Sequence, residues 1–116
     1  MTSLTPFITA VTEELSLNTQ NILGNRLSKI ILYGSYARGD YKPYSDLDLM
    51  VLGSFNEDEQ KIFENEIDKV ASDIGLDHDI IISVLLNNEN LFMSRLHISP
   101  FYRNVLSEGV EVYGTR

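Results

Sequence analysis

The chain has no cysteine and no tryptophan among its 116 residues, and only 3 prolines. Without cysteine it can form neither a disulfide nor a thiolate metal site. No apolar run approaches the roughly 20 residues that a membrane-spanning helix requires. No basic residue precedes Arg26, and the N-terminal stretch carries Glu13 and Glu14, which is not the pattern of a secretory signal. We therefore expect a cytoplasmic protein that does not contact a membrane.

Basic residues are also scarce: 9 Lys and Arg stand against 17 Asp and Glu, for a net charge of −8. Binding to a phosphate backbone needs clustered Lys and Arg, so direct nucleic-acid binding is not expected and a basic protein partner is favoured. With 43% apolar and 22% charged residues, the composition is that of a globular protein. The length predicts a single domain over residues 1–116.

Helical and β patterns alternate along the chain, which predicts an α/β or α+β domain. The two strands predicted over residues 29–34 and 46–53 are joined by only 11 residues, which is short for a parallel crossover. We therefore expect a mixed sheet of three to four strands flanked by helices. The further predicted elements are strands over 79–86 and 110–113, a helix starting at Pro6, a helix from the capping box at Asn56 to a stop at Gly75, and helices over 88–97 and 100–108.

Two aspartates, Asp46 and Asp48, interrupt an otherwise apolar strand. Residues two apart on a strand point to the same face, with backbone positions about 6.6 Å apart. At an effective dielectric constant of about 20, two negative charges at that distance repel each other by about 2.5 kcal/mol. Asp79 begins the next β-rich stretch and could reach the pair if the two strands are neighbours. Three converging carboxylates need cations, and oxygen ligands select Mg²⁺ or Mn²⁺.

Two other interpretations of the pair remain open at this point. Asp46 can be a turn residue at the strand entry and Asp48 a solvated charge on an edge strand. A calcium loop starting at Asp46 would place Glu57 at its twelfth position. The fifth and sixth positions, however, are Met50 and Val51, and the sixth has to be glycine, so the stretch is not an EF-hand.

A glycine turn lies upstream of the aspartates, in the stretch "GSYARG". Gly34 allows the close approach of a backbone or a ligand, and the N–H groups that follow it can point toward an anion. Ser35 can donate its hydroxyl to a phosphate oxygen, and Arg38 lies on the same side of a helical turn. The turn by itself can be a simple strand-to-helix connection. Next to the aspartate pair it indicates a phosphate site.

The joined pattern of Gly34-Ser35, ten intervening residues and Asp46-Leu47-Asp48 resembles the DNA-polymerase-β-like nucleotidyltransferase superfamily. The fuller stretch "GSYARG…SDLDLMV" is similar to its minimal nucleotidyltransferase branch, which includes the MntA-like antitoxins. The ending "SPFYRNVLSEGVEVY" is also similar to that branch. The family pattern adds a third aspartate on a later strand, for which Asp79 is the candidate and Asp77 the alternative.

The resemblance implies a polymerase-β-like fold and transfer of a nucleoside monophosphate, most simply AMP from ATP, to an acceptor hydroxyl. Asp46, Asp48 and Asp79 would bind two Mg²⁺ ions, with Mn²⁺ as an alternative metal. Asp79 would also help to deprotonate the acceptor.

The same resemblance gives the glycine turn a role in nucleotide binding. Gly34, Ser35 and Arg38 would hold the β- and γ-phosphates and stabilise the leaving pyrophosphate. Ser45 would orient the aspartate pair or simply stabilise a turn.

Three functions are compatible with these residues. Minimal nucleotidyltransferases of this size commonly attach AMP to a tyrosine of a HEPN toxin, acting as antitoxins of type VII toxin–antitoxin systems, so the resemblance implies a hetero-oligomer with such a toxin. An antitoxin without catalysis would bind through the acidic helix or the segment Phe101–Tyr102. An aminoglycoside nucleotidyltransferase would need a homodimer to complete its acceptor site.

Overall fold

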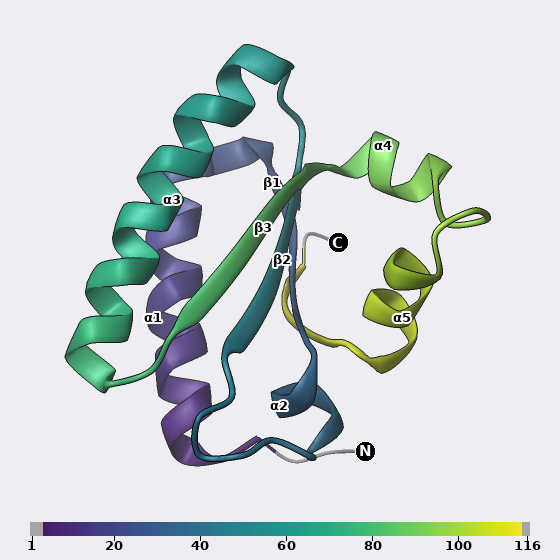
Figure 1. The fold of residues 1–116 in the computed structure, drawn as a ribbon. Coiled ribbons are helices and arrows are strands. Elements are labelled where there is room, and N and C mark those ends of the chain that lie inside the picture. The colour runs from purple at the N-terminus through teal and green to yellow at the C-terminus, as the bar shows by residue number, and fades with distance from the viewer. Residues whose placement is uncertain (1–3, 115–116) are drawn as a thin grey trace.

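The centre of the computed structural model, which describes residues 4–114, is a sheet of four strands in the order β3-β2-β1-β4. Residues 1–3 and 115–116 of the expected domain lie outside the described residues. The strands are β1 (Leu27–Tyr33), β2 (Leu47–Gly53), β3 (Ile82–Asn88) and β4 (Val110–Gly114). Strand β1 pairs antiparallel with β2 and β4, whereas β2 pairs parallel with β3. The predicted mixed sheet flanked by helices is confirmed (Figure 1).

Helices cover both faces of this sheet. The long helices α1 (Pro6–Leu23) and α3 (Glu57–His78) lie side by side on one face, and α4 (Glu89–Ser94) and α5 (Pro100–Glu108) lie on the other (Figure 1). Two short helices, η1 (Gly24–Arg26) and α2 (Ser35–Arg38), precede and follow β1. Within residues 4–114, no helix combines the length and apolarity needed to cross a membrane.

Strand β2 is buried on both of its faces. Leu47, Leu49 and Val51 pack into the larger core under α1 and α3, while Met50 and Leu52 pack with the fully buried Phe92 under α4 and α5. Burying one such side chain contributes about 1.5–3 kcal/mol. The charged Asp48 shares its face with Met50 and Leu52, so it lies on the smaller core's side of the sheet, where that core ends.

The predicted helix starts are confirmed by their caps. The hydroxyl of Thr5 accepts a hydrogen bond from the N–H of Ile8, and that of Ser99 accepts one from Tyr102. Asn56 and Glu59 form the predicted capping box at the start of α3. These side chains satisfy N–H groups that the first turn of a helix leaves without partners.

The predicted stop at Gly75 is wrong, because α3 continues to His78. Asp79 ends the helix with φ 55° and ψ 48°, the left-handed conformation that aspartate tolerates better than most residues. A Cβ on Gly75 would lie 2.5 Å from the carbonyl oxygen of Ile80, so this glycine serves the close return of the chain. The strand predicted over 79–86 therefore starts later, at Ile82, and the helix predicted over 88–97 is reduced to α4.

Candidate active site

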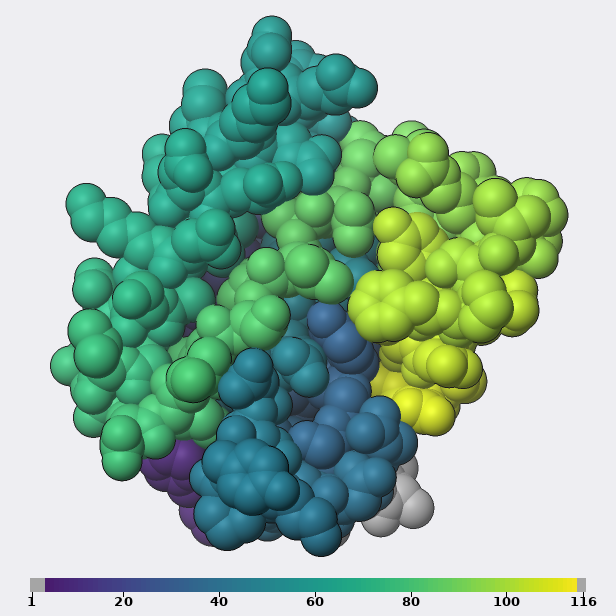
Figure 2. Space-filling view, viewed as in Figure 1, coloured from purple at the N-terminus to yellow at the C-terminus, as the bar shows by residue number. Residues whose placement is uncertain are grey.

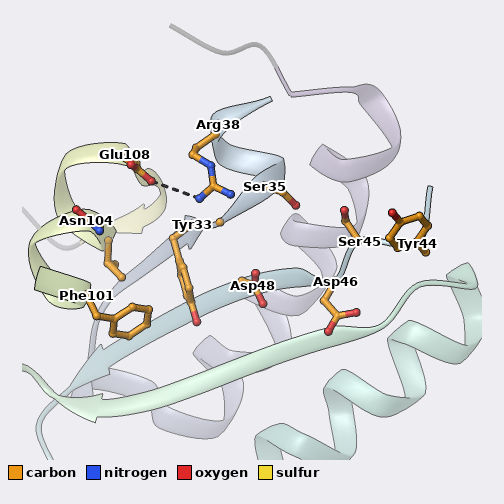
Figure 3. A pocket seen from close by; sticks show the side chains of 12 residues that line it. Tyr33, Ser35, Arg38, Tyr44, Ser45, Asp46, Asp48, Phe101, Asn104 and Glu108 are labelled. Carbon is orange, nitrogen blue, oxygen red and sulfur yellow. Dashed lines mark hydrogen bonds and ion pairs between the residues drawn. The ribbon is translucent and has the colours of Figure 1, made fainter. Parts of the chain in front are cut away.

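The glycine turn and the aspartate pair meet at one end of the sheet. Tyr33, the last residue of β1, pairs with Asp48 on β2, so Gly34 and Asp46 both lie at this end. A cavity of about 550 Å³ opens there (Figure 3). Its lining residues are Tyr33, Gly34, Ser35, Arg38, Tyr44, Ser45, Asp46, Asp48, Phe101, Asn104, Val105 and Glu108.

Gly34 is required at its position for two reasons. Its backbone has φ 77° and ψ −156°, a conformation that only glycine adopts readily. A Cβ at this position would lie 2.5 Å from Oδ2 of Asp48. The glycine therefore allows the chain to turn directly over the carboxylate on the neighbouring strand.

The short helix α2 is held firmly at the cavity wall. The N–H groups of Ala37 and Arg38 both donate to the carbonyl oxygen of Gly34, at 3.1 Å. Tyr36 is buried and stacks on Tyr41 at 4.4 Å between ring centroids, which fixes the following loop against the helix. Ser35, the first residue of α2, is thereby presented to the cavity.

Arg38 is the one basic side chain among the described residues that line the cavity, where three lining side chains are acidic. Its Nε lies 3.2 Å from Oδ2 of Asp40, and its Nη1 lies 3.4 Å from Oε2 of Glu108 on α5 (Figure 3). The hydrogen bond to Asp40, together with the nearby charges of Asp40 and Glu108, raises the pKa of Arg38. A fixed positive charge thus lies beside the aspartate pair.

The electrostatics of the aspartate pair are unfavourable within the protein itself. Burial raises the pKa of Asp48 and the charge of Asp46 raises it further, while Arg38 acts in the opposite direction. Burial and the charge of Asp48 also raise the pKa of the Tyr33 hydroxyl to about 12. The Asp48 carboxylate therefore lies partly desolvated beside the negative charge of Asp46. Two carboxylates beside the glycine turn are a donor set that fits Mg²⁺, which commonly binds one or two carboxylates together with substrate phosphates.

Ser45 makes turn contacts in this structure. Its hydroxyl accepts a hydrogen bond from the N–H of Lys42 at 2.8 Å, and its own N–H donates to the carbonyl of Lys42 at 3.0 Å. This turn delivers the chain to Asp46. These hydrogen bonds stabilise a turn, and none of them joins Ser45 to Asp46 or Asp48.

Asp79 does not join the pair. It is exposed at the end of α3 and lines a neighbouring cavity, and Asp77 lies within α3. The residue of β3 that pairs with Asp48 is Ser83. Across residues 4–114, no group of three His, Cys, Asp or Glu side chains is arranged to hold a metal ion. The structure thus brings together Asp46 and Asp48 with the glycine turn, but not the third carboxylate.

Several lining residues carried no signal that singled them out in the sequence. Tyr33 and Tyr44 have no feature in the sequence that distinguishes them from other aromatic residues, and Phe101 was considered only as part of a partner-binding segment. Asn104 and Glu108 are four residues apart on α5, so they share one helix face, and that face borders the cavity. This spacing was the available signal, but only the fold reveals that the face points to the aspartates.

Replacing Gly34 by alanine tests the close approach of turn and carboxylate. We expect Gly34→Ala to lower the free energy of unfolding by about 1–3 kcal/mol through backbone strain, and further because its Cβ meets Asp48. Gly24→Ala is the matched control, because Gly24 also has positive φ (58°) but its Cβ would meet nothing within 4 Å. Urea denaturation measures both. Equal losses for the two variants would show that Gly34 and Asp48 are not in contact.

Removing the charge of Asp48 tests whether the carboxylates of Asp46 and Asp48 repel each other in the folded protein. A raised pKa in the folded state means that the ionised form is disfavoured there, so wild-type stability falls as the pH rises through that pKa. We expect Asp48→Asn to be at least as stable as the wild type at pH 7, with the difference shrinking on acidification. Thermal unfolding between pH 4 and 8 measures this, with the exposed Asp73→Asn on α3 as control. A less stable Asp48→Asn protein at pH 7 would give Asp48 a structural role instead.

The sequence of the chain matches a known protein family. A family model described as "Nucleotidyltransferase domain" matches residues 18–112. "Putative protein adenylyltransferase MJ0604" of Methanocaldococcus jannaschii is 39% identical over 88 residues, covering 76% of this chain and 80% of that relative. The similarly named MJ0141 of the same organism is 34% identical over 108 residues, covering 90% of this chain and 98% of that relative.

Solved structures show the same fold at low identity. A toxin–antitoxin complex crystallised with AMP-PNP contains a chain with a TM-score of 0.55 and 18% identity, covering 90% of this chain and 74% of the other. A chain in a variant of the MntA-HpeT toxin–antitoxin complex has a TM-score of 0.53 and 16% identity, covering 87% of this chain and 72% of the other. The resemblance found in the sequence is therefore confirmed: the chain belongs to the nucleotidyltransferase domain family and has its polymerase-β-like fold.

Proposed function

We propose that the chain is a Mg²⁺-dependent adenylyltransferase that moves AMP from ATP to a tyrosine hydroxyl of a HEPN toxin, as the antitoxin of a type VII system. The observation that carries the proposal is the meeting of the Gly34 turn with Asp46 and Asp48 at one cavity. Two relatives named as protein adenylyltransferases and the similarity to a toxin–antitoxin chain support it.

The nucleotide would bind with its phosphates over the glycine turn. Ser35 would donate its hydroxyl to a phosphate oxygen, and Arg38, at the other end of the short helix α2, would offer its guanidinium to the terminal phosphates. Asp46 and Asp48 would hold Mg²⁺, which neutralises phosphate charge when bound and makes the α-phosphorus more electrophilic. The acidic lining alone would repel a triphosphate, so the arrangement favours a nucleotide that arrives with its cation.

The transfer itself is a displacement at the α-phosphorus. The acceptor oxygen forms a bond to this phosphorus while the bond to the bridging oxygen of the β-phosphate breaks, and pyrophosphate leaves with the bonding electrons. Arg38 and Ser35 would stabilise the charge that develops on the pyrophosphate. The proton of the acceptor hydroxyl would pass to Asp79, which lies on the β3 side of the aspartate pair.

One observation favours a second candidate, an antitoxin that acts by binding alone. Asp79 lies apart from the aspartate pair, and Ser83 occupies the β3 position beside Asp48. A chain that cannot complete its set of carboxylates could still occlude a toxin through α3 or Phe101.

Labelled ATP separates these candidates and the aminoglycoside alternative. The chain is incubated with [α-³²P]ATP and Mg²⁺, together with either a HEPN protein encoded beside its gene or kanamycin. We expect label on a tyrosine of the HEPN protein, lost with EDTA and in Asp48→Asn, and retained in Asp73→Asn. A stable complex without label would establish binding alone, and label on kanamycin would establish an antibiotic-modifying enzyme; either result would overturn the proposal.

Asp79 has a matched control two residues away. We expect Asp79→Asn to keep Mg²⁺-dependent binding of AMP-PNP but to lower the transfer rate by about a hundredfold or more, because the acceptor loses its base. Asp77→Asn, also an exposed residue at the end of α3, should transfer at nearly the wild-type rate. The measurements are calorimetric binding and the initial rate of labelling. Unchanged turnover in Asp79→Asn would remove this residue from the mechanism.

A further inference from the structure

A second cavity, of about 680 Å³, adjoins the candidate active site. Its walls are the last turns of α3, the segment that leads into β3, and the loop that precedes β2. Tyr44 and Ser45 line both cavities, so the two are neighbours with a shared wall. Figure 2 shows this surface, where the loop before β2 (blue) lies next to the connection from α3 to β3 (teal to green).

The strand order fixes on which side of the aspartates this cavity lies. Gly34 follows β1, Asp46 and Asp48 belong to β2 or its entry, and the second cavity lies at the start of β3. The aspartate pair therefore lies between the glycine turn and the second cavity. Figure 3 shows the same order, with Asp46 directed away from Arg38 and Glu108.

The geometry of phosphoryl transfer indicates from which side the acceptor approaches the nucleotide. In an in-line displacement, the attacking and leaving oxygens lie on opposite sides of the phosphorus. If pyrophosphate leaves toward Ser35 and Arg38, the acceptor hydroxyl approaches from the side of β3. The second cavity opens on that side.

The second cavity combines exposed apolar side chains with carboxylates. Tyr44, Leu76 and Ile81 are 82%, 80% and 68% exposed, and they are the three most exposed large apolar side chains among the described residues. All three line this cavity, together with the carboxylates of Asp68 and Asp79. An apolar patch with acidic neighbours at the entrance of a site suits an apolar polypeptide segment with a basic residue beside it. An aminoglycoside offers positive charge but little apolar surface to cover Leu76 and Ile81.

We propose that this cavity, the acceptor groove formed by Tyr44, Leu76, Asp79 and Ile81, docks the segment of the acceptor protein that carries the modified hydroxyl. The segment places an apolar side chain against Leu76 and Ile81 and a Lys or Arg near Asp68, which leaves Asp79 for the acceptor hydroxyl. This inference rests on the proposed adenylyl transfer to a protein and adds where that protein binds.

The test removes apolar surface from the groove without changing charge. The groove variant is Leu76→Gln with Ile81→Gln; both side chains are exposed, so the fold should be kept. The control is Leu17→Gln with Ile62→Gln, the same residue types at 62% and 57% exposure and outside the groove. Transfer from [α-³²P]ATP is measured at varied concentrations of the HEPN protein. We expect kcat/KM for that protein to fall about tenfold or more in the groove variant only, with the affinity for AMP-PNP and Mg²⁺ unchanged within about twofold.

The possible failures are distinguishable. A wild-type chain that transfers no AMP to the protein overturns the proposed function and this inference with it. A wild-type chain that does transfer, with a groove variant as active as the control, overturns the groove alone. Light scattering measures the oligomeric state of both proteins. If the wild type is a dimer and the groove variant is a monomer, with labelling unchanged, the groove binds a second copy of the chain instead.

Discussion

The contact between the Gly34 backbone and the Asp48 carboxylate is the constraint on which the rest of the site depends. The antiparallel pairing of β1 and β2 sets it, because Tyr33 lies opposite Asp48 and the chain must turn immediately afterwards. Only a residue without a side chain leaves room for the carboxylate at this turn. One pairing of two strands thereby brings the glycine turn next to the Asp46–Asp48 pair, although the two are separated in the sequence.

The charges around this contact are balanced incompletely by the protein. Arg38 partly offsets the aspartates, yet it is also held by Asp40 and Glu108. The surrounding fold can sustain the repulsion because β2 is buried on both faces between two helix layers. The stability of the sheet thus holds acids close together that would separate in a flexible loop, and the unbalanced charge is what a cation with a nucleotide would satisfy.

Much of the architecture followed from local signals in the sequence. Thr5, Asn56 and Ser99 marked helix starts because capping depends on side chains within one turn. The short connection between the first two strands correctly predicted a mixed sheet. The end of α3 was misjudged, because Gly75 resembles a stop signal while its role depends on a carbonyl that returns from outside the helix.

In the candidate site, too, local motifs were predictable from the sequence and contacts between distant segments were not. The glycine turn and the Asp46–Asp48 pair were predictable because each is a compact motif. Asp79 was expected on a strand, and the longer α3 places it at a helix end instead, beside the groove rather than the pair. Glu108 and Asn104 could not be assigned, because α5 reaches the cavity only through tertiary packing. Contacts between distant segments are what pattern and spacing leave undetermined.

We propose that Asp46 and Asp48 form a cation site for a nucleotide. Calorimetric titration of the wild-type chain with AMP-PNP, with Mg²⁺ or with EDTA, tests it most directly. We expect the affinity for AMP-PNP to fall by about tenfold or more when Mg²⁺ is removed, because the acidic cavity then faces an uncompensated triphosphate. Equal affinity in the presence and absence of the cation would contradict it.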